Sequence, residues 1–286
     1  AMELGADHRV VADVTALARI GSFAAAEGVP LTLFAVGRDL ERAEAGSALA
    51  ELGERGHLVE NHSWEHPYDL TRRSRAAIEE QVRRGADAIE RVTGRRPQGF
   101  RAPGYTVSDT LFDVLEEEGT RFDASLLSSP PYYLAKVLAL GGSRLRGRQS
   151  AAILGSARVL AAPRAPYRPG RPWYQPGRRA LVELPVSTSG RARLPFIGTA
   201  LTLAGLEGAR WLARGCLGQP LVSLELHGID FLDVDDGLDD LRGRQPDVTI
   251  AVARKRAALA AALAVLRRAG HRFVTLARAC DILNIT

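Results

Sequence analysis

Cysteine, methionine and lysine are scarce in this 286-residue sequence. Cys216 and Cys280 are the only cysteines, and they lie far apart in no metal-binding or redox motif, so we expect buried thiols. No run of about 18 apolar residues occurs, which excludes an obvious membrane-spanning helix. No glycine-rich phosphate loop and no G-x-S-x-G motif is present either, so the sequence offers no sign of a P-loop enzyme or of that class of serine hydrolase.

Positive charge is carried almost entirely by arginine. The 38 Lys and Arg residues include just two lysines, Lys136 and Lys255, and the net charge is +5. The simplest explanation is a GC-rich bacterial genome, and the alternative is an anionic partner such as a phosphate group or a lipid surface. Basic patches interleaved with aromatics and known nucleic-acid motifs are missing, so no nucleic-acid binding is expected.

Localisation stays open from the sequence. No signal peptide is visible, but the chain starts with Ala1-Met2, which is typical of a fragment or a processed product rather than of natural initiation. We favour the cytoplasm, with contact to the membrane surface as an alternative. The oligomeric state is left undetermined.

Strand-like and helix-like segments alternate in the first half of the chain. Residues 29–36, 99–101 and 121–125 are predicted as strands, as is the segment after Gly56 that contains Leu58-Val59. Residues 9–27, 39–54, 74–92 and 109–118 are predicted as helices, the last with Ser108 as an N-cap. This alternation predicts an α/β fold with a parallel sheet or barrel, in which functional residues lie at the carboxyl ends of the strands.

The second half of the chain departs from this alternation. Residues 127–198 contain many prolines, arginines and aromatics, and we interpret them as an insertion that covers one side of the barrel mouth. Strands are predicted at 181–186, 220–226 and 272–276, and helices at 204–215 and 248–269. With 46% hydrophobic residues the chain can bury a substantial core, and we treat residues 1–286 as a single domain.

Two histidines four residues apart, His62 and His66, form the first candidate site. The apolar residues Leu58-Val59 precede the pair, and Pro67 follows it directly, which favours a tight turn at a strand end over a regular helix. Neutral imidazole is the usual nitrogen ligand of Zn²⁺, so the pair predicts a metal site. Alone, this spacing is also common in proteins without a metal.

Three more polar residues lie at predicted strand ends, namely Arg101, Asp123 and His227. A metal on the histidine pair could polarise a carbonyl group and lower the pKa of bound water. His227 could protonate a leaving amine, Asp123 could orient it or raise its pKa, and Arg101 could keep another carboxylate ionised. A third protein ligand and a general base are not evident among these residues.

Four motifs in order resemble those of the polysaccharide deacetylase family, also called carbohydrate esterase family four. His62-Ser63-Trp64-Glu65-His66 resembles its H-[ST]-x-x-H motif, and Arg101-Ala102-Pro103-Gly104-Tyr105 resembles its R-x-P motif. Phe122-Asp123-Ala124-Ser125 and Leu224-Glu225-Leu226-His227 are similar to its fourth and fifth motifs. The resemblance spans residues 29–276 and is weaker within the 127–198 insertion.

The resemblance implies a distorted (β/α) barrel, similar to a TIM barrel, and metal-dependent hydrolysis of an N-acyl group on an amino sugar. It implies His62 and His66 as metal ligands, His227 as general acid, Arg101 as support for the catalytic base, and Asp123 as a residue that tunes His227 or lines the groove. Pro103, Gly104 and Tyr105 would contact substrate, with Tyr105 placed to supply a backbone donor to the oxyanion. The implied cofactor is a divalent metal, with Zn²⁺ expected.

One departure from the family pattern concerns its first motif, a strand that ends in paired aspartates. Asp7 and Asp13 are the only early aspartates, and neither follows an apolar strand. We therefore expect the first strand, with the third ligand, to lie upstream of Ala1. A barrel lacking that strand would expose a sheet edge, bind metal poorly and hydrolyse little.

Three functions remain open from the sequence. The first is a deacetylase acting on an N-acylated amino-sugar glycan, free or linked to phosphate or lipid, with impaired activity in this chain. The second is a non-catalytic relative that binds glycan or protein with the same groove. The third is a related carbon–nitrogen hydrolase that acts on a formyl group or a cyclic amide.

Overall fold

A computed structural model describes residues 6–145, 153–243 and 245–285, with the side chains of 6–13 and 143–145 left out of the description. Five short parallel strands form the central sheet in the order β1-β2-β3-β4-β5. Their bounds are Thr32–Ala35, Leu58–Asn61, Gly99–Phe100, Phe122–Asp123 and Val182–Glu183. A separate two-stranded antiparallel sheet pairs β6 (Thr188–Ser189) with β7 (Leu194–Pro195).

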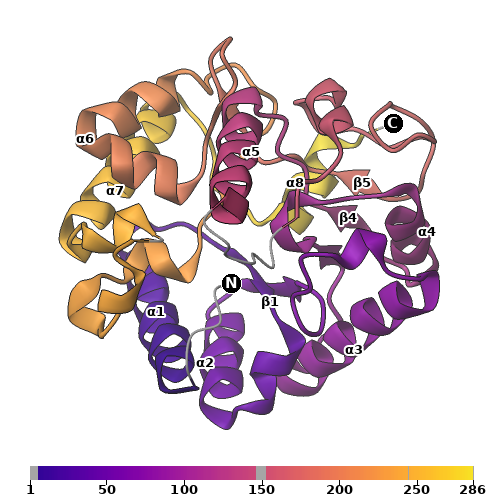
Figure 1. Cartoon of the computed structure of the whole chain (residues 1–286), viewed down its shortest axis with the longest axis horizontal. Helices are drawn as coiled ribbons and strands as arrows, with labels where there is room; N and C mark the ends of the chain where they lie inside the picture. The colour runs from indigo at the N-terminus through magenta and orange to yellow at the C-terminus, as the bar shows by residue number, and fades with distance from the viewer. Residues whose placement is uncertain (1–5, 146–152, 244, 286) are drawn as a thin grey trace.

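Helices surround the strands, as Figure 1 shows. The bounds of the α-helices are α1 Ala6–Glu27, α2 Ala43–Glu54, α3 Arg75–Thr93, α4 Asp109–Glu117, α5 Pro130–Leu145, α6 Gly198–Arg214, α7 Val252–Arg268 and α8 Leu276–Leu283. Short 3₁₀ helices lie at Gly37–Glu41, Leu70–Arg72, Pro103–Tyr105, Ala157–Ala161, Gly228–Phe231, Val234–Asp236, Asp239–Leu241 and Pro246–Thr249. The arrangement is the expected distorted (β/α) barrel, and it is not closed.

The first half of the fold follows the sequence expectation closely. The four predicted strands and four predicted helices are present, shortened or lengthened by a few residues. Ser108 accepts a hydrogen bond from the Leu111 amide at 3.1 Å, which confirms the N-cap. Gly85 lets α3 approach the strand, because an added Cβ there would lie 2.3 Å from the Asn61 side-chain oxygen.

Two predicted strands in the second half were wrong. Residues 220–226 form only one isolated parallel bridge, between Glu225 and Ile197. A further backbone bond runs from the Ser187 N–H to the Ser223 carbonyl at 2.9 Å, and these contacts are too few for a regular strand. Residues 272–275 are extended but unpaired, and the chain continues into α8, which sequence reasoning missed. The apolar Phe273 of this segment packs against the α6–α7 core rather than adding to the sheet.

The sheet has a free edge at β1. Its one strand partner among the described residues is β2, and β1 is the end strand of the sheet order. This is the edge at which the sequence predicted an additional strand. The structure describes no residue before Ala6 and leaves that prediction untested.

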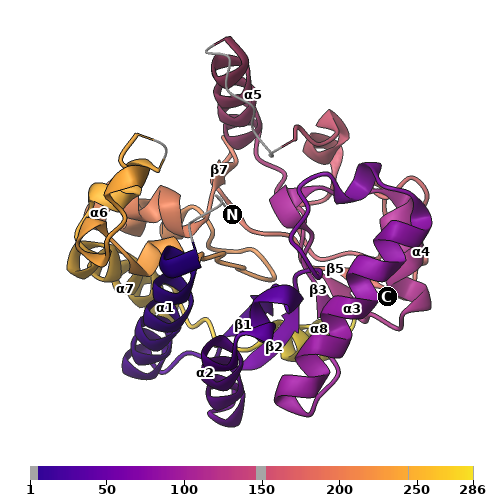
Figure 2. The same cartoon turned by 60° about the horizontal axis from the view of Figure 1, so that its bottom comes forward.

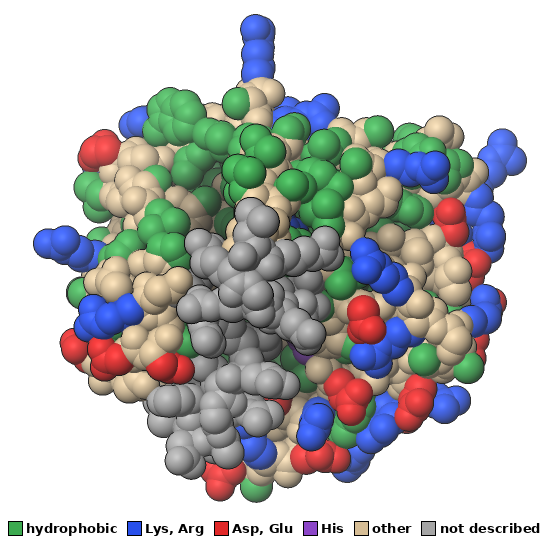
Figure 3. Space-filling model, viewed as in Figure 1, with side chains coloured by type: hydrophobic (Ala, Val, Ile, Leu, Met, Phe, Trp, Pro, Cys, Tyr) green, Lys and Arg blue, Asp and Glu red, His purple; other side chains and the backbone are tan. Residues whose placement is uncertain are grey.

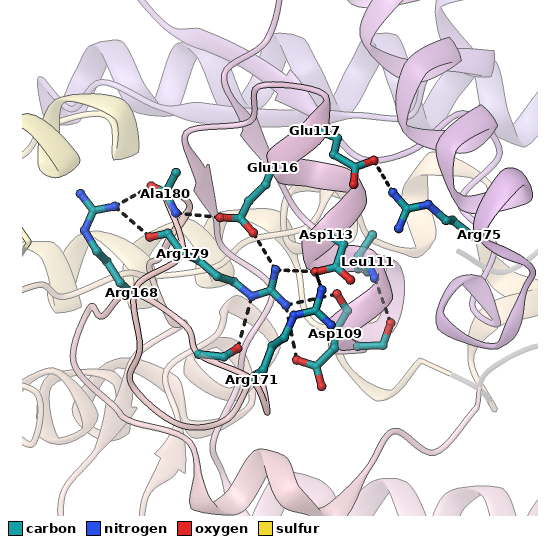
Figure 4. Close-up of polar contacts among 12 residues, drawn as sticks. Arg75, Asp109, Leu111, Asp113, Glu116, Glu117, Arg168, Arg171, Arg179 and Ala180 are labelled. Carbon is teal, nitrogen blue, oxygen red and sulfur yellow. Dashed lines mark hydrogen bonds and ion pairs between the residues drawn. The ribbon is translucent and has the colours of Figure 1, made fainter.

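Arginine side chains fasten the 127–198 insertion to the barrel (Figure 4). Arg179 donates hydrogen bonds to Asp113 at 2.7 Å and to Glu116 at 2.6 Å, both on α4, and its own side chain is only 7% exposed. Glu116 also accepts a bond from the Ala180 amide at 2.7 Å, and Arg171 pairs with Asp113. These charge pairs therefore hold the insertion to α4, in addition to the pairing of β5 with β4 in the central sheet. Three arginines of the insertion follow the apolar part of α5 in sequence: Arg144 lies in the last turn of α5, and Arg146 and Arg148 lie outside the described residues.

Candidate active site

A tight turn after β2 presents the histidine pair. Ser63 and His66 both have positive φ values, 66° and 58°, so the segment is not helical, as Pro67 predicted. The Asn61 side chain holds the turn by accepting from the Ser63 amide at 2.9 Å and donating to the Val82 carbonyl at 2.8 Å. The Ser63 hydroxyl accepts from the His66 amide at 3.1 Å. These bonds fix both imidazoles at the carboxyl end of the strand.

The two imidazoles suit a metal as nitrogen donors. Their ring centroids are 4.6 Å apart, and His62 Nδ1 hydrogen-bonds the Arg101 carbonyl at 2.6 Å, which leaves Nε2 available. Burial lowers the pKa of His62 well below its ordinary value and that of His66 to about 3, so both are neutral. Within the described part of the chain no third His, Cys, Asp or Glu completes a ligand group with them. The site therefore fits a metal with two of the usual three protein ligands.

Arg101 follows β3 and points back into the same space. Its Nε donates to the Ala124 carbonyl at 2.9 Å, and its guanidinium lies 4.4 Å from the centroid of the Phe34 ring. One terminal nitrogen is 4.0 Å from a carboxylate oxygen of Glu225. Arg101 is thus fixed by the backbone of the next strand and faces a carboxylate, which is the kind of contact predicted for it.

His227 joins this group through an ion pair with Glu225. His227 Nε2 donates to Glu225 at 2.9 Å, and the Glu225 side chain is only 3% exposed whereas that of His227 is 53% exposed. Glu225 raises the pKa of His227 to about 9, whereas His227 and Arg101 together lower that of Glu225 to about 2 despite burial. Asp230 accepts a bond from the His227 amide at 2.7 Å and fixes the backbone. At neutral pH His227 carries a proton.

Sequence reasoning missed Glu225. It stands two residues before His227, so in an extended segment both side chains point to the same face. A charged residue inside the apolar run PLVSLEL was the available signal. The structure places this carboxylate where the sequence had expected Asp123 to act.

Asp123 lies beneath the site and is fully buried. Its contacts are with the Ser125 amide and hydroxyl, at 2.9 and 2.8 Å, and with Glu183 of the next strand. Burial raises the pKa of both carboxyl groups, and the neighbouring Asp123 raises that of Glu183 further. Asp123 therefore does not line an open groove, and its influence on His227 stays a prediction. Ser125 also accepts from the Ala102 amide at 2.7 Å, which links the pair to the turn above.

The turn at Pro103, Gly104 and Tyr105, predicted to contact substrate, borders the site. Gly104 and Tyr105 have φ values of 68° and 59°, and Lys136 of α5 donates to the Gly104 carbonyl at 2.9 Å. Pro103 is buried, whereas Gly104 and Tyr105 are half-buried. The Tyr105 ring packs edge-on against Tyr132 with centroids 5.3 Å apart. The turn is thereby tied to the insertion that rises beside it.

The structure thus brings four of the predicted residues together. The charge of His227 lowers the pKa of both His62 and His66, and Arg101 contacts the group from β3. These side chains come from the ends of β2 and β3 and from the segment beside Ile197. Two neutral imidazoles, one protonated imidazole and an arginine can together hold a cation, donate a proton and stabilise negative charge.

Comparison with known proteins finds a matching family model. Residues 13–122 match the family model of the polysaccharide deacetylases, and this segment includes His62, His66 and Arg101. Over this segment the chain is similar to the polysaccharide deacetylase family. No curated protein is significantly similar in sequence.

Solved structures of polysaccharide deacetylases and related esterases share the fold. A Mycobacterium smegmatis protein assigned to the polysaccharide deacetylases has 17% identity and a TM-score of 0.61, with 98% of this chain and 82% of that chain covered. The Xyl-CE4 domain of a multidomain xylanase from the hindgut metagenome of Trinervitermes trinervoides has 12% identity and a TM-score of 0.54, covering 95% and 86%. A family 4 acetyl xylan esterase from Clostridium thermocellum, in complex with cobalt, has 15% identity and a TM-score of 0.51, also covering 95% and 86%. At these identities the likeness concerns the fold alone.

Proposed function

We propose that the protein is a metal-dependent hydrolase that removes an N-acetyl group from an amino sugar in a glycan. The observation that carries the proposal is the convergence of His62 and His66, at the carboxyl end of β2, with His227, in a fold shared with polysaccharide deacetylases. The acetyl group and the glycan are the chemistry of the family, and the protonated His227 can supply the proton that a departing amine requires.

His62 and His66 would hold the metal, for which we propose Zn²⁺. A bound divalent cation polarises the acyl carbonyl and increases the acidity of water. The remaining chemistry falls to this chain's own residues. His227, protonated at neutral pH because of Glu225, donates its proton to the departing amine nitrogen. Arg101 adds positive charge on the side of Glu225 and can keep a catalytic carboxylate ionised.

The third ligand and the general base are proposed to come from an aspartate pair on a strand upstream of Ala1. The free edge of β1 supports this proposal, because a parallel strand added there would end on the same side of the sheet as β2, with β1 between it and the strand that carries the histidines. With two ligands, this chain is expected to bind metal weakly and to hydrolyse substrate slowly. The rival function is a glycan- or protein-binding relative without catalysis, which is favoured by the two-histidine ligand group that the described residues provide.

An acetate-release assay separates these functions. The protein, loaded with Zn²⁺ or Co²⁺, is given N-acetylated chitooligosaccharides, peptidoglycan fragments, acetylated xylan and a formylated amino sugar. The proposal predicts acetate from an amino-sugar substrate and its loss in His62→Ala and His227→Ala. Binding of the same glycan without acetate release, in the short and the upstream-extended protein alike, supports the non-catalytic function. Release of formate alone identifies the third class of hydrolase.

A further inference from the structure

Exposed large hydrophobic side chains are concentrated on two helices of this protein. Among the described residues, seven of eight lie on α5, on α6 or just after α6, and only Ile282 on α8 lies elsewhere. The seven are Leu134, Val137, Leu138, Leu203, Leu206, Trp211 and Leu217. Figure 3 shows apolar side chains gathered over α5 and neighbouring segments on the face that also exposes a histidine. We call these seven residues the apolar surface.

Helix α5 projects from the body of the protein, as Figure 2 shows. Leu134 is 58% exposed and Leu138 is 66% exposed, and the alanines between and after them are exposed too. The single charged residue from 130 to 142 is Lys136, and its amino group donates a hydrogen bond to the Gly104 carbonyl. A projecting helix without a polar outer face is typical of a segment that binds a membrane or the apolar surface of another protein.

Helix α6 continues the apolar surface. The first turns of α5 and α6 meet in one cluster, in which Tyr132 and Ala200 pack on Leu127, Val186 and Ile197. Further along α6, Trp211 is 58% exposed, whereas Trp64 and Trp173 are 5% and 7% exposed. An exposed tryptophan among leucines is typical of side chains that sit at the boundary between lipid and water.

The charge beside this surface favours an anionic bilayer over a second copy of the chain. Arg210 and Arg214 stand on α6 beside Trp211, and Arg210 pairs with the exposed Glu207 of the same helix. The whole chain has a net charge of +5. Two copies meeting here would place like charges together, whereas acidic lipid headgroups would neutralise them. In the described part of the chain no helix is long and apolar enough to cross a membrane.

We propose that α5 and α6 form a membrane-docking surface, whose leucines and Trp211 enter the interface of an anionic bilayer beside the candidate active site. Leu134 and Leu138 would supply most of the buried area, and the arginines would contact headgroup phosphates. If the proposed deacetylase function holds, the surface brings the site next to a glycan carried by a membrane lipid. The docking itself is measured without any catalytic readout.

Vesicle binding tests the proposal directly. The protein is sedimented with vesicles of phosphatidylcholine alone and of phosphatidylcholine mixed with phosphatidylglycerol, while tryptophan emission is recorded. We expect binding to the mixed vesicles, weakened by salt, and a blue shift that disappears in Trp211→Phe, because the other two tryptophans are already buried. No binding to the mixed vesicles, or binding without any contribution from Trp211, would overturn the proposal.

Matched variants identify the surface. Leu138→Glu is expected to reduce partitioning about tenfold or more, since burying a leucine is worth roughly 1.5–3 kcal/mol. Ile282→Glu on α8 is the control, as Ile282 is 42% exposed but lies outside the apolar surface, and it should bind as the parent does. Equal losses in both variants would contradict the assignment. Sedimentation velocity without lipid tests whether a second copy of the chain covers the surface instead. If the parent protein is a dimer and Leu138→Glu is a monomer, the surface is a dimer interface and the membrane proposal is wrong.

Discussion

The proton on His227 depends on a single buried carboxylate, Glu225. The interaction is a 2.9 Å contact within a group that also includes Arg101. Asp230 supports the His227 backbone, and its pKa is raised to about 7 by burial. Hence the acid–base state of the site near neutral pH is controlled within one segment, residues 225–230.

Glu225→Gln should lower the pKa of His227 from about 9 towards or below its ordinary value of 6.5. The amide keeps an acceptor near Nε2 but removes the negative charge that favours the imidazolium, while burial and Arg101 still oppose it. NMR titration of the His227 ring measures this shift, whether or not the protein is catalytically active. Asp123→Asn is the matched control and should leave the His227 titration nearly unchanged. An unchanged titration in Glu225→Gln would rule out the ion pair as the cause.

The buried carboxyl pair below the site makes a prediction about pH and stability. Glu183 has a pKa well above 4.5 in the folded protein, so folding retains a proton that the unfolded chain releases. This contribution is complete below about pH 4.5 and is lost as pH rises through the folded pKa. Glu183→Gln mimics the protonated form, and its amide can donate to Asp123 at every pH.

We therefore expect Glu183→Gln to become more stable relative to the parent protein as pH rises from 5 to 8. The free energy of unfolding should rise relative to the parent by about 1.4 kcal/mol for each pH unit between 5 and 8 that lies below the folded pKa of Glu183. Urea unfolding at the two pH values measures it, and subtracting the parent removes the effects of other buried acids. Parallel pH dependence in the two proteins would contradict the assignment of a shared proton.

At the scale of elements, the 127–198 insertion depends on Arg179. This guanidinium is 7% exposed and bridges two acids of α4, so its removal leaves Asp113 with only the exposed Arg171 and Glu116 with only the Ala180 amide. We expect Arg179→Ala to lower the free energy of unfolding by about 3 kcal/mol, the lower end for breaking a buried pair. Urea unfolding measures this change.

Arg171→Ala is the control for that measurement. Arg171 contacts the same Asp113 but is 66% exposed, so solvent screens the pair and the loss should stay under about 1 kcal/mol. Similar losses in the two variants would show that burial does not distinguish the two arginines.

The elements also show why sequence reasoning succeeded in one half of the chain. From residue 29 to 125, strands and helices alternate with clear periodicity, and caps such as Ser108 mark their ends. After residue 127, hydrogen bonds from arginine side chains hold the chain in place. Arg168 donates to the Ile285 carbonyl, and Arg179 bonds Asp113 and Glu116, which lie more than sixty residues earlier in the sequence. No local sequence pattern encodes such long-range contacts. In the same way, the apolar runs at 220–226 and 272–276 predicted strands, because the sequence does not show whether a run finds a strand partner in the fold.

At the scale of the whole molecule, the sequence predicted which residues meet at the site better than it predicted which charged groups pair there. His62, His66, Arg101 and His227 were found because each ends a strand-like run, and the ends of parallel strands converge. Glu225 was missed and Asp123 was assigned its position, because sequence spacing does not tell which carboxylate a folded barrel places beside a histidine. Among the described residues, β1 has a strand partner on one side only and the histidine pair has no third ligand, and an additional strand would account for both observations.

Zinc titration tests the central claim most directly, that this chain carries two ligands of a metal site completed from upstream. Competition with a chelating dye is measured for this chain, for its His62→Ala/His66→Ala variant, and for a form extended through the preceding codons of its gene. The account predicts weak binding by the chain, which the double variant abolishes, and tight binding of one Zn²⁺ by the extended form. Tight one-to-one binding by the short chain, or none in the extended form, would contradict it.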